Sequence, residues 1–272
     1  MDDELYKKVN YLVDIPLMIN ANIVEYDISK ANITMMLSYG LISQDEYNKF
    51  ASMDKMTREV SIGRRIKADN GELTSSGIRI QKCITEGIKN AKRLLFEYNQ
   101  LPVESIVRIA NDAVFVNGGL LRYTDFDLNN NGIIVSFKQK NVFNIMLNLG
   151  LVTIFINDNP MANSIDVDVK GIKDELLNKH QPFLEFICNL LSDMQRSGKE
   201  TALLIFNDFY EKYINKELPV EYYREFNATS SYRFAKSHQF YIDDAPESYK
   251  DKLDIEYNLS VLRKLYSAIM DL

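Results

Sequence analysis

Residues 74–99 are the feature that most limits how this chain can fold. Apolar side chains recur there at helical spacing (Ile80, Ile84, Ile88, Ala91 and Leu95), which predicts one long amphipathic helix. Beyond that helix, short β-branched and apolar runs are separated by tight turns rich in asparagine, aspartate and glycine. These runs predict antiparallel hairpins, and a long helix beside such a sheet indicates an α+β fold.

We expect further elements on both sides of this helix. The expected strands cover residues 21–27, 104–109, 114–116, 121–126, 133–138 and 151–156. The expected helices cover residues 3–13, 29–39, 43–53, 74–99, 169–195 and 199–215, with Ser43 as an N-cap. The pattern predicts an antiparallel sheet with helices on one face, followed by a mainly helical C-terminal region. We place the domain boundary near residue 160, which gives domains of 1–160 and 161–272.

Composition excludes several classes of protein. No apolar run reaches the roughly 18–20 residues of a membrane span, and the acidic start is unlike a signal peptide. We therefore expect a cytoplasmic protein with no membrane partner. Cys83 and Cys188 fall in predicted helices and are expected to be free, buried thiols. The two histidines, His180 and His238, stand alone, so we expect no structural zinc.

The charge of the chain is unevenly distributed. The net charge is -6, yet the stretch from Lys55 to Arg93 carries ten basic and four acidic residues. One interpretation of this stretch is a solvated helix face. The other is a strip that faces the phosphates of a nucleic acid.

Two aspartates lie where a phosphoryl-transfer site would need them. Asp27 follows an apolar strand and precedes a helix, and Asp112 lies at the turn of a predicted hairpin. If those strands are neighbours, both carboxylates emerge at the same sheet edge. Two-metal phosphoryl transfer requires carboxylates that converge on a pair of cations roughly 3.5–4 Å apart. Either aspartate alone is more often a helix cap or a turn residue.

The motifs around these aspartates resemble those of the family B DNA polymerases. Residues 25–33, with Asp27, occupy the place of the first palm motif, D-x-x-S-L-Y-P. Residues 55–63 match the lysine and the glycine of the fingers motif, K-x-x-x-N-S-x-Y-G. Residues 110–115 keep the second aspartate and the phenylalanine of D-T-D-S-x-F. Residues 138–143 are similar to the later lysine pair with its aromatic, and residues 213–219 resemble the start of the thumb.

The resemblance implies a polymerase palm with reduced fingers at about residues 40–100, a helical palm extension or thumb from 161 to 272, and no exonuclease. It implies that Asp27 and Asp112 bind Mg²⁺ or Mn²⁺, with the Ile28 carbonyl as a third ligand. Lys55 would neutralise the triphosphate of the incoming nucleotide.

Other basic residues would bind nucleotide or nucleic acid. Lys138 and Lys140 would hold the primer backbone, as the resemblance implies. No family motif assigns Arg58, Arg64 and Arg65. We place Arg58 with the nucleotide and the other two with the nucleic acid.

Several positions depart from the family pattern. Ala110 replaces the first aspartate of the hairpin motif, and Glu59 and Ile62 replace the fingers asparagine and tyrosine. Asn32 falls where the family has the tyrosine that excludes a ribose 2′-OH, and our hypothesis is that this smaller residue admits ribonucleotides.

Two functions follow from this pattern. The first is template-directed nucleotidyl transfer by a minimal family B-like DNA polymerase or a primase-like enzyme, acting on primer–template and nucleoside triphosphates in replication, repair or priming. The second is a catalytically degenerate palm that binds nucleic acid or other replication proteins as a subunit. The Lys-, Ile- and Asn-rich usage indicates an AT-rich bacterial or phage genome.

Two further groups have structural interpretations. Asp158, Asp166 and Asp168 suggest a metal site, but we interpret them as solvated surface. An aromatic-rich run near the end of a domain would stack on bases or, in the interpretation that we favour, pack against the palm. Its members are Tyr210, Tyr213, Tyr222, Tyr223, Phe226, Tyr232 and Phe234.

Overall fold

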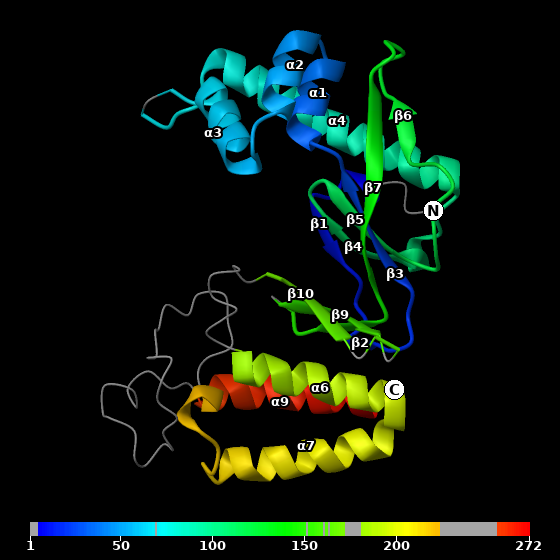
Figure 1. Cartoon of the computed structure of the whole chain (residues 1–272), viewed down its shortest axis with the longest axis vertical. Coiled ribbons are helices and arrows are strands. Elements are labelled where there is room, and N and C mark those ends of the chain that lie inside the picture. The colour runs from blue at the N-terminus through cyan, green and yellow to red at the C-terminus, as the bar shows by residue number, and fades with distance from the viewer. Residues whose placement is uncertain are drawn as a thin grey trace. The chain divides into compact units, whose positions relative to one another are not determined.

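The computed structural model describes residues 5–68, 70–150, 152–159, 161–162, 164–171, 181–223 and 255–272. The chain divides into two compact units (Figure 1). The first unit contains Met1–Val13 and Asn22–Val142, and the second contains Asp14–Ala21 and Phe143–Leu272. The division after Val142 differs from the boundary that we predicted near residue 160. The reason is that the strands beyond it pair with one another and with a short strand from Asp14–Ala21.

A six-stranded sheet forms the base of the first unit, with strand order β1-β4-β5-β3-β7-β6. Its strands are β1 (Asn10–Leu12), β3 (Ile23–Ile28), β4 (Ile106–Ala110), β5 (Ala113–Asn117), β6 (Asp125–Asp127) and β7 (Ile134–Phe143). The pairs β1–β4, β4–β5, β3–β5 and β6–β7 are antiparallel. Strand β3 lies inside the sheet, and successive side chains on both of its faces are buried.

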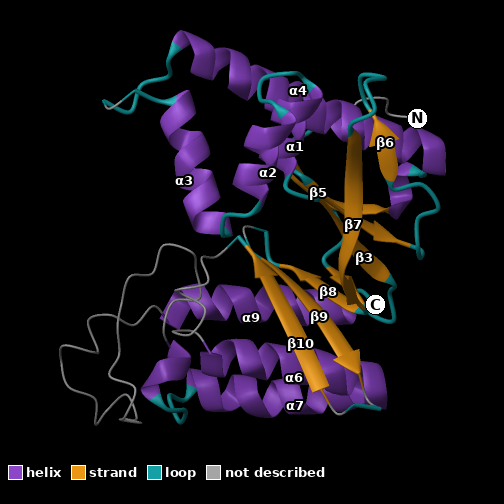
Figure 2. Ribbon diagram, turned by 45° about the horizontal axis from the view of Figure 1, so that its top comes forward, coloured by secondary structure: helices purple, strands orange, loops and turns teal. Residues whose placement is uncertain are grey.

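The helices of the first unit are α1 (Ala31–Ser38), α2 (Gln44–Ala51), α3 (Lys55–Ile66) and α4 (Ser75–Asn99), with 3₁₀ turns η1 (Leu5–Lys7) and η2 (Val103–Ser105). Ser43, Asp54 and Thr74 each cap the helix that follows by accepting a backbone N–H bond. The apolar stripe of α4 is buried in one core with α1 and the sheet. Figure 2 shows α3 and the start of α4 away from the strands.

The second unit is an antiparallel sheet in the order β10-β9-β8-β2, with helices on one face (Figure 2). Its strands are β2 (Leu17–Met18), β8 (Ile145–Asn148), β9 (Thr153–Asn159) and β10 (Ser164–Lys170). Its helices are α6 (Gln181–Ser197), α7 (Lys199–Ile214) and α9 (Ile255–Met270), with the 3₁₀ turn η3 (Val220–Tyr223). Strands and helices bury a second core of their own.

The predicted α+β class and helical C-terminal region are confirmed, but several local elements differ from the prediction. Residues 3–13 form η1 and β1 instead of a helix, because the backbone of β1 pairs with β4. Strand β10 was not predicted, and its last two residues fall in the helix predicted at 169–195. It forms because it pairs along its whole length with β9. Residues 55–66, left without a predicted element, form α3. Residues 172–180 of the helix predicted at 169–195 lie outside the described residues.

The interpretation of Asp158 as solvated surface is also wrong. Its side chain is 0% exposed, and its carboxylate accepts hydrogen bonds from Nε and Nη2 of Arg196, the first at 2.9 Å. This ion pair joins β9 to α6. Asp166 is exposed, and Asp168 pairs with Lys170 at 2.9 Å.

Both cysteines and two of the aromatic residues lie at buried or half-buried positions. Both thiols are free, and burial raises the pKa of Cys188 to about 12, whereas Cys83 is only half-buried. The rings of Tyr213 and Tyr223 are fully buried with centroids 4.5 Å apart, which confirms packing for these two. Phe226, Tyr232 and Phe234 lie outside the described residues. No helix in the described ranges is long and apolar enough to cross a membrane.

Gly77 provides a test of how closely α4 approaches α3. A Cβ atom at Gly77 would overlap the backbone oxygen of Ile66, whereas one at Gly63 in α3 would meet nothing within 4 Å. We expect Gly77→Ala to lower the free energy of unfolding by about 1–3 kcal/mol through overpacking. Gly63→Ala, the matched control, should raise it by about 0.5–1 kcal/mol through helix propensity. Urea unfolding measures both, and two changes of the same sign would contradict the close approach.

Asp127 gives a pH-dependent test of the loop between β6 and β7. Its carboxylate accepts backbone N–H bonds from Gly132 at 2.7 Å, Asn131 at 3.1 Å and Asn129 at 3.3 Å. These bonds hold the pKa of Asp127 below its ordinary value of 3.8. Asp127→Asn should therefore lower the melting temperature at about pH 7, and the difference should shrink as the pH falls below that ordinary value. Thermal unfolding over this range tests it, with Asp125→Asn as control; a pH-independent difference would count against it.

Candidate active site

Strand pairing brings the two predicted aspartates to one edge of the first sheet. Asp27 on β3 lies opposite Ala113, the first residue of β5, and Asp112 is the turn residue just before it. The N–H of Ile28 donates to the backbone oxygen of Asp112 at 3.1 Å. The expected convergence of the two aspartates on neighbouring strands is therefore present in the structure.

The charges around this pair are close enough to affect one another. Burial, and then the negative charge of Asp27, raise the pKa of Asp112, while Lys55 and Lys140 oppose the rise. Lys140 Nζ lies 3.4 Å from Asp27 Oδ2, and the two side chains are 53% and 32% exposed. Two carboxylates that repel each other thus share a site with two lysines.

The two lysines reach the carboxylates from different elements. Lys55 is the first residue of α3, directly after its N-cap Asp54, and its side chain is exposed. Lys140 lies on β7, and Lys138, two residues earlier on the same strand, is also exposed. Residues far apart in sequence, on β3, β7, the β4–β5 turn and the start of α3, therefore interact at this edge.

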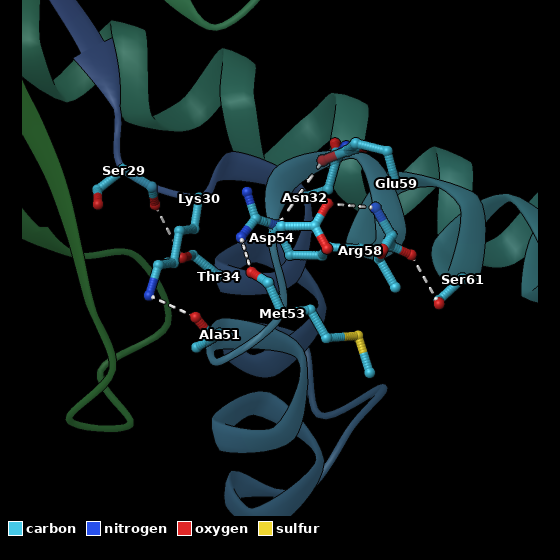
Figure 3. Close-up of polar contacts among 11 residues, drawn as sticks. Ser29, Lys30, Asn32, Thr34, Ala51, Met53, Asp54, Arg58, Glu59 and Ser61 are labelled. Atoms are coloured by element: carbon cyan, nitrogen blue, oxygen red, sulfur yellow. Dashed lines mark hydrogen bonds and ion pairs between the residues drawn. The ribbon is translucent and has the colours of Figure 1, made fainter.

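The predicted nucleotide-binding residues Asn32 and Arg58 meet at Glu59, between α1 and α3 (Figure 3). Asn32 Nδ2 donates to Glu59 Oε2 at 2.8 Å, and Arg58 Nε lies 3.9 Å from Glu59 Oε1. Arg58 also donates to the Met53 carbonyl at 3.5 Å, and its side chain is only 12% exposed. Arg58 is therefore held against the protein, and Asn32 is linked to an acidic residue.

Arg64 and Arg65 lie at the opposite end of α3 from Lys55. Ten residues of helix separate Lys55 from Arg65, which is about 15 Å along the axis. Arg65 donates to Glu46 at 2.6 Å, with its guanidinium 5.0 Å from the ring centre of Phe50. The structure thus does not bring these arginines to the carboxylate pair. The exposed basic residues at this end of the α3–α4 pair are Arg64, Arg65, Lys67, Arg79 and Lys82.

Two charged residues near the site were missed by our reading of the sequence. Glu25, on β3, is 2% exposed and accepts a hydrogen bond from Asn141 Nδ2 at 2.6 Å. Lys92, on α4, is 1% exposed and interacts electrostatically with Asp112. The signal was available in both cases, because each is a charged residue at an apolar position of its strand or helix.

The donor atoms at this edge fit a small divalent cation. Carboxylate and carbonyl oxygens are the ligands of Mg²⁺, which is commonly held by one or two carboxylates together with substrate phosphates. Asp27, Asp112 and the neighbouring Ile28 carbonyl match that description, and a cation would relieve the repulsion that raises the pKa of Asp112. In the described ranges, no group of three or more His, Cys, Asp or Glu side chains forms a metal site.

The chain belongs to the bacteriophage PBS1 gene 130 protein family, whose family model matches residues 1–271. No curated protein matches the chain in sequence. The AT-rich usage indicates a bacterial or phage genome, and the family is described as a bacteriophage protein. The family description names no activity, so the function must be argued from the site.

The Asp27–Asp112 pair is expected to lower the stability of the folded protein, so replacing one of its carboxylates should raise that stability. Asp112→Asn removes a carboxylate whose ionisation is disfavoured in the folded protein. We expect the variant to melt at a higher temperature than wild type at about pH 7 without divalent cations, and the advantage to fade as the pH falls toward the ordinary pKa. Thermal unfolding in a chelator measures this. A variant that melts below wild type would show that Asp112 is stabilised, not strained, by its surroundings.

Proposed function

We propose that this phage protein catalyses template-directed nucleotidyl transfer at the Asp27–Asp112 edge, as a minimal family B-like DNA polymerase or a primase-like enzyme. The observation that carries the proposal is the convergence of two carboxylates and two lysines there. Together with the order of motifs along the chain, it favours phosphate chemistry over an ordinary surface ion pair. The substrates are a primer–template and nucleoside triphosphates, and the product is DNA or RNA.

Asp27, Asp112 and the Ile28 carbonyl would hold Mg²⁺ or Mn²⁺. Such ions supply charge neutralisation of phosphate oxygens and lower the pKa of a bound hydroxyl. The protein's own contribution is to hold both carboxylates in place through β3, β5 and the Ile28–Asp112 backbone bond. Preorganised charge of this kind favours a reaction without rearrangement during the step.

The lysines would bind the phosphates of the substrates. Lys55, exposed at the start of α3, interacts electrostatically with Asp112 and would neutralise the triphosphate. In the structure Lys140 forms an ion pair with Asp27. Its flexible side chain would allow it to leave Asp27 and, together with Lys138, bind the primer backbone. Arg64 and Arg65 would contact the nucleic acid away from the reacting atoms, as phosphate contacts that position the chain.

Asn32 and Glu59 bear on the choice of sugar. Asn32 is smaller than the tyrosine that the family B polymerases have at this position, and its side chain is hydrogen-bonded to Glu59. The pair offers polar groups and no ring against a ribose 2′-OH. We therefore propose that ribonucleotides are accepted.

A second candidate is a catalytically degenerate palm that binds nucleic acid or other replication proteins. The specific observation in its favour is the Asn32–Glu59–Arg58 group, which puts an acidic side chain one turn along α3 from Lys55 and holds Arg58 against the Met53 carbonyl. Ala110 and the net charge of -6 point the same way. Both candidates predict nucleic-acid binding, and they differ in turnover.

Primer extension separates the two candidates. Purified protein with a primed template, labelled ribo- or deoxynucleotides and Mg²⁺ or Mn²⁺ should extend the primer. Asp27→Asn and Asp112→Asn should lose at least about 10³-fold in rate, because each removes half of the carboxylate pair. Asp125→Asn, on the same sheet but outside the pair, is the matched control.

Extension that persists in both Asn variants would show that the activity belongs to another site or a contaminant. No extension by a folded wild-type protein with either metal would favour the degenerate palm. If only deoxynucleotides are used, the assignment of Asn32 to ribose acceptance is wrong.

A further inference from the structure

Lys92 is a charged side chain where the packing calls for an apolar one. It lies on the buried stripe of α4, among Ile88, Ala91 and Leu95, and is 1% exposed. Burial, together with the nearby Lys89, lowers its pKa to about 8, and Asp112 acts in the opposite direction. Because an ammonium group is costly to bury, its retention in this core calls for a compensating interaction.

A series of hydrogen bonds connects Lys92 to the turn that carries Asp112. Its Nζ donates to the backbone oxygen of Lys8 at 2.7 Å. The next carbonyl, that of Val9, accepts the N–H of Asn111 at 2.6 Å, and Asn10 then pairs with Ala110. The segment from Lys8 to Asn10 is thus held between α4 and the β4–β5 turn.

That turn is short and has a left-handed residue. Asn111 has a φ of 45°, in the left-handed region that asparagine adopts more readily than most residues, and it directly precedes Asp112. The Val9–Asn111 bond holds one side of the turn, and the Ile28–Asp112 bond holds the other.

We infer that Lys92 is a positioning residue: through its bond to Lys8 it anchors the segment that fixes the Asp112 turn. It touches neither substrate nor cation and acts through residues 8–10 and the turn. Its effect on catalysis rests on the proposed function, whereas its effect on the turn does not.

The test compares Lys92→Met, Lys92→Arg and the control Lys89→Met. Lys89 lies one turn away on α4 and pairs with Glu86 at 3.6 Å, so its replacement removes a neighbouring charge without the bond to Lys8. Hydrogen exchange of the Asn111 amide, relative to that of Val114 in the same hairpin, reports the turn. Mn²⁺ affinity measured by electron paramagnetic resonance reports the carboxylate pair.

We expect Lys92→Met to stay folded, to exchange the Asn111 amide faster than wild type, and to bind Mn²⁺ about 10-fold more weakly, as for other residues that orient metal ligands. Lys92→Arg should recover part of both losses, and Lys89→Met should match wild type. If Lys92→Met does not fold, Lys92→Arg decides: it should keep part of the protection at Asn111, and a folded Arg variant that keeps none overturns the proposal. Unchanged exchange in Lys92→Met overturns it as well. A wild-type protein that binds no Mn²⁺ would count against the proposed function alone, since the exchange measurement still tests Lys92.

Discussion

The antiparallel pairing of β3 with β5 determines where the charged groups of the candidate site lie. Asp27 lies opposite Ala113, and the Ile28 N–H bonds to the Asp112 carbonyl, so a register shift of one residue would turn the Asp27 side chain to the other face. The same sheet order places β7 beside β3 and brings Lys140 to Asp27. The site therefore depends on backbone hydrogen bonds before it depends on any side chain.

Burying charged groups at the candidate site and in the core behind α4 is expected to lower the stability of the fold. Asp112 is half-buried beside another carboxylate, and Lys92 is fully buried in an apolar core. A protein under selection for stability alone would replace either group, because amide or apolar side chains of similar size would remove the repulsion and the desolvation. Such strain is typical of functional sites. By contrast, the Asp158–Arg196 pair in the second unit joins a strand to a helix through hydrogen bonds between opposite charges.

Each unit has its own core, and the candidate site lies within the first. The second unit pairs its strands among themselves and covers one face of its sheet with helices. Within this unit the Asn144 side chain bonds both the N–H and the carbonyl of Asp158.

Local sequence alone determined the helices with clear apolar spacing and capping residues, the tight turn at Asp112 and the strand that carries Asp27. These depend on interactions between residues close in the chain, which periodicity and turn composition report. Tertiary structure decided the rest. Residues 10–12 form a strand because they pair with β4. Asp158 is buried because Arg196 forms an ion pair with it. Lys92 is linked to the turn because residues 8–10 lie between α4 and that turn. Each is a contact between residues far apart in sequence, whose partner no local pattern can identify.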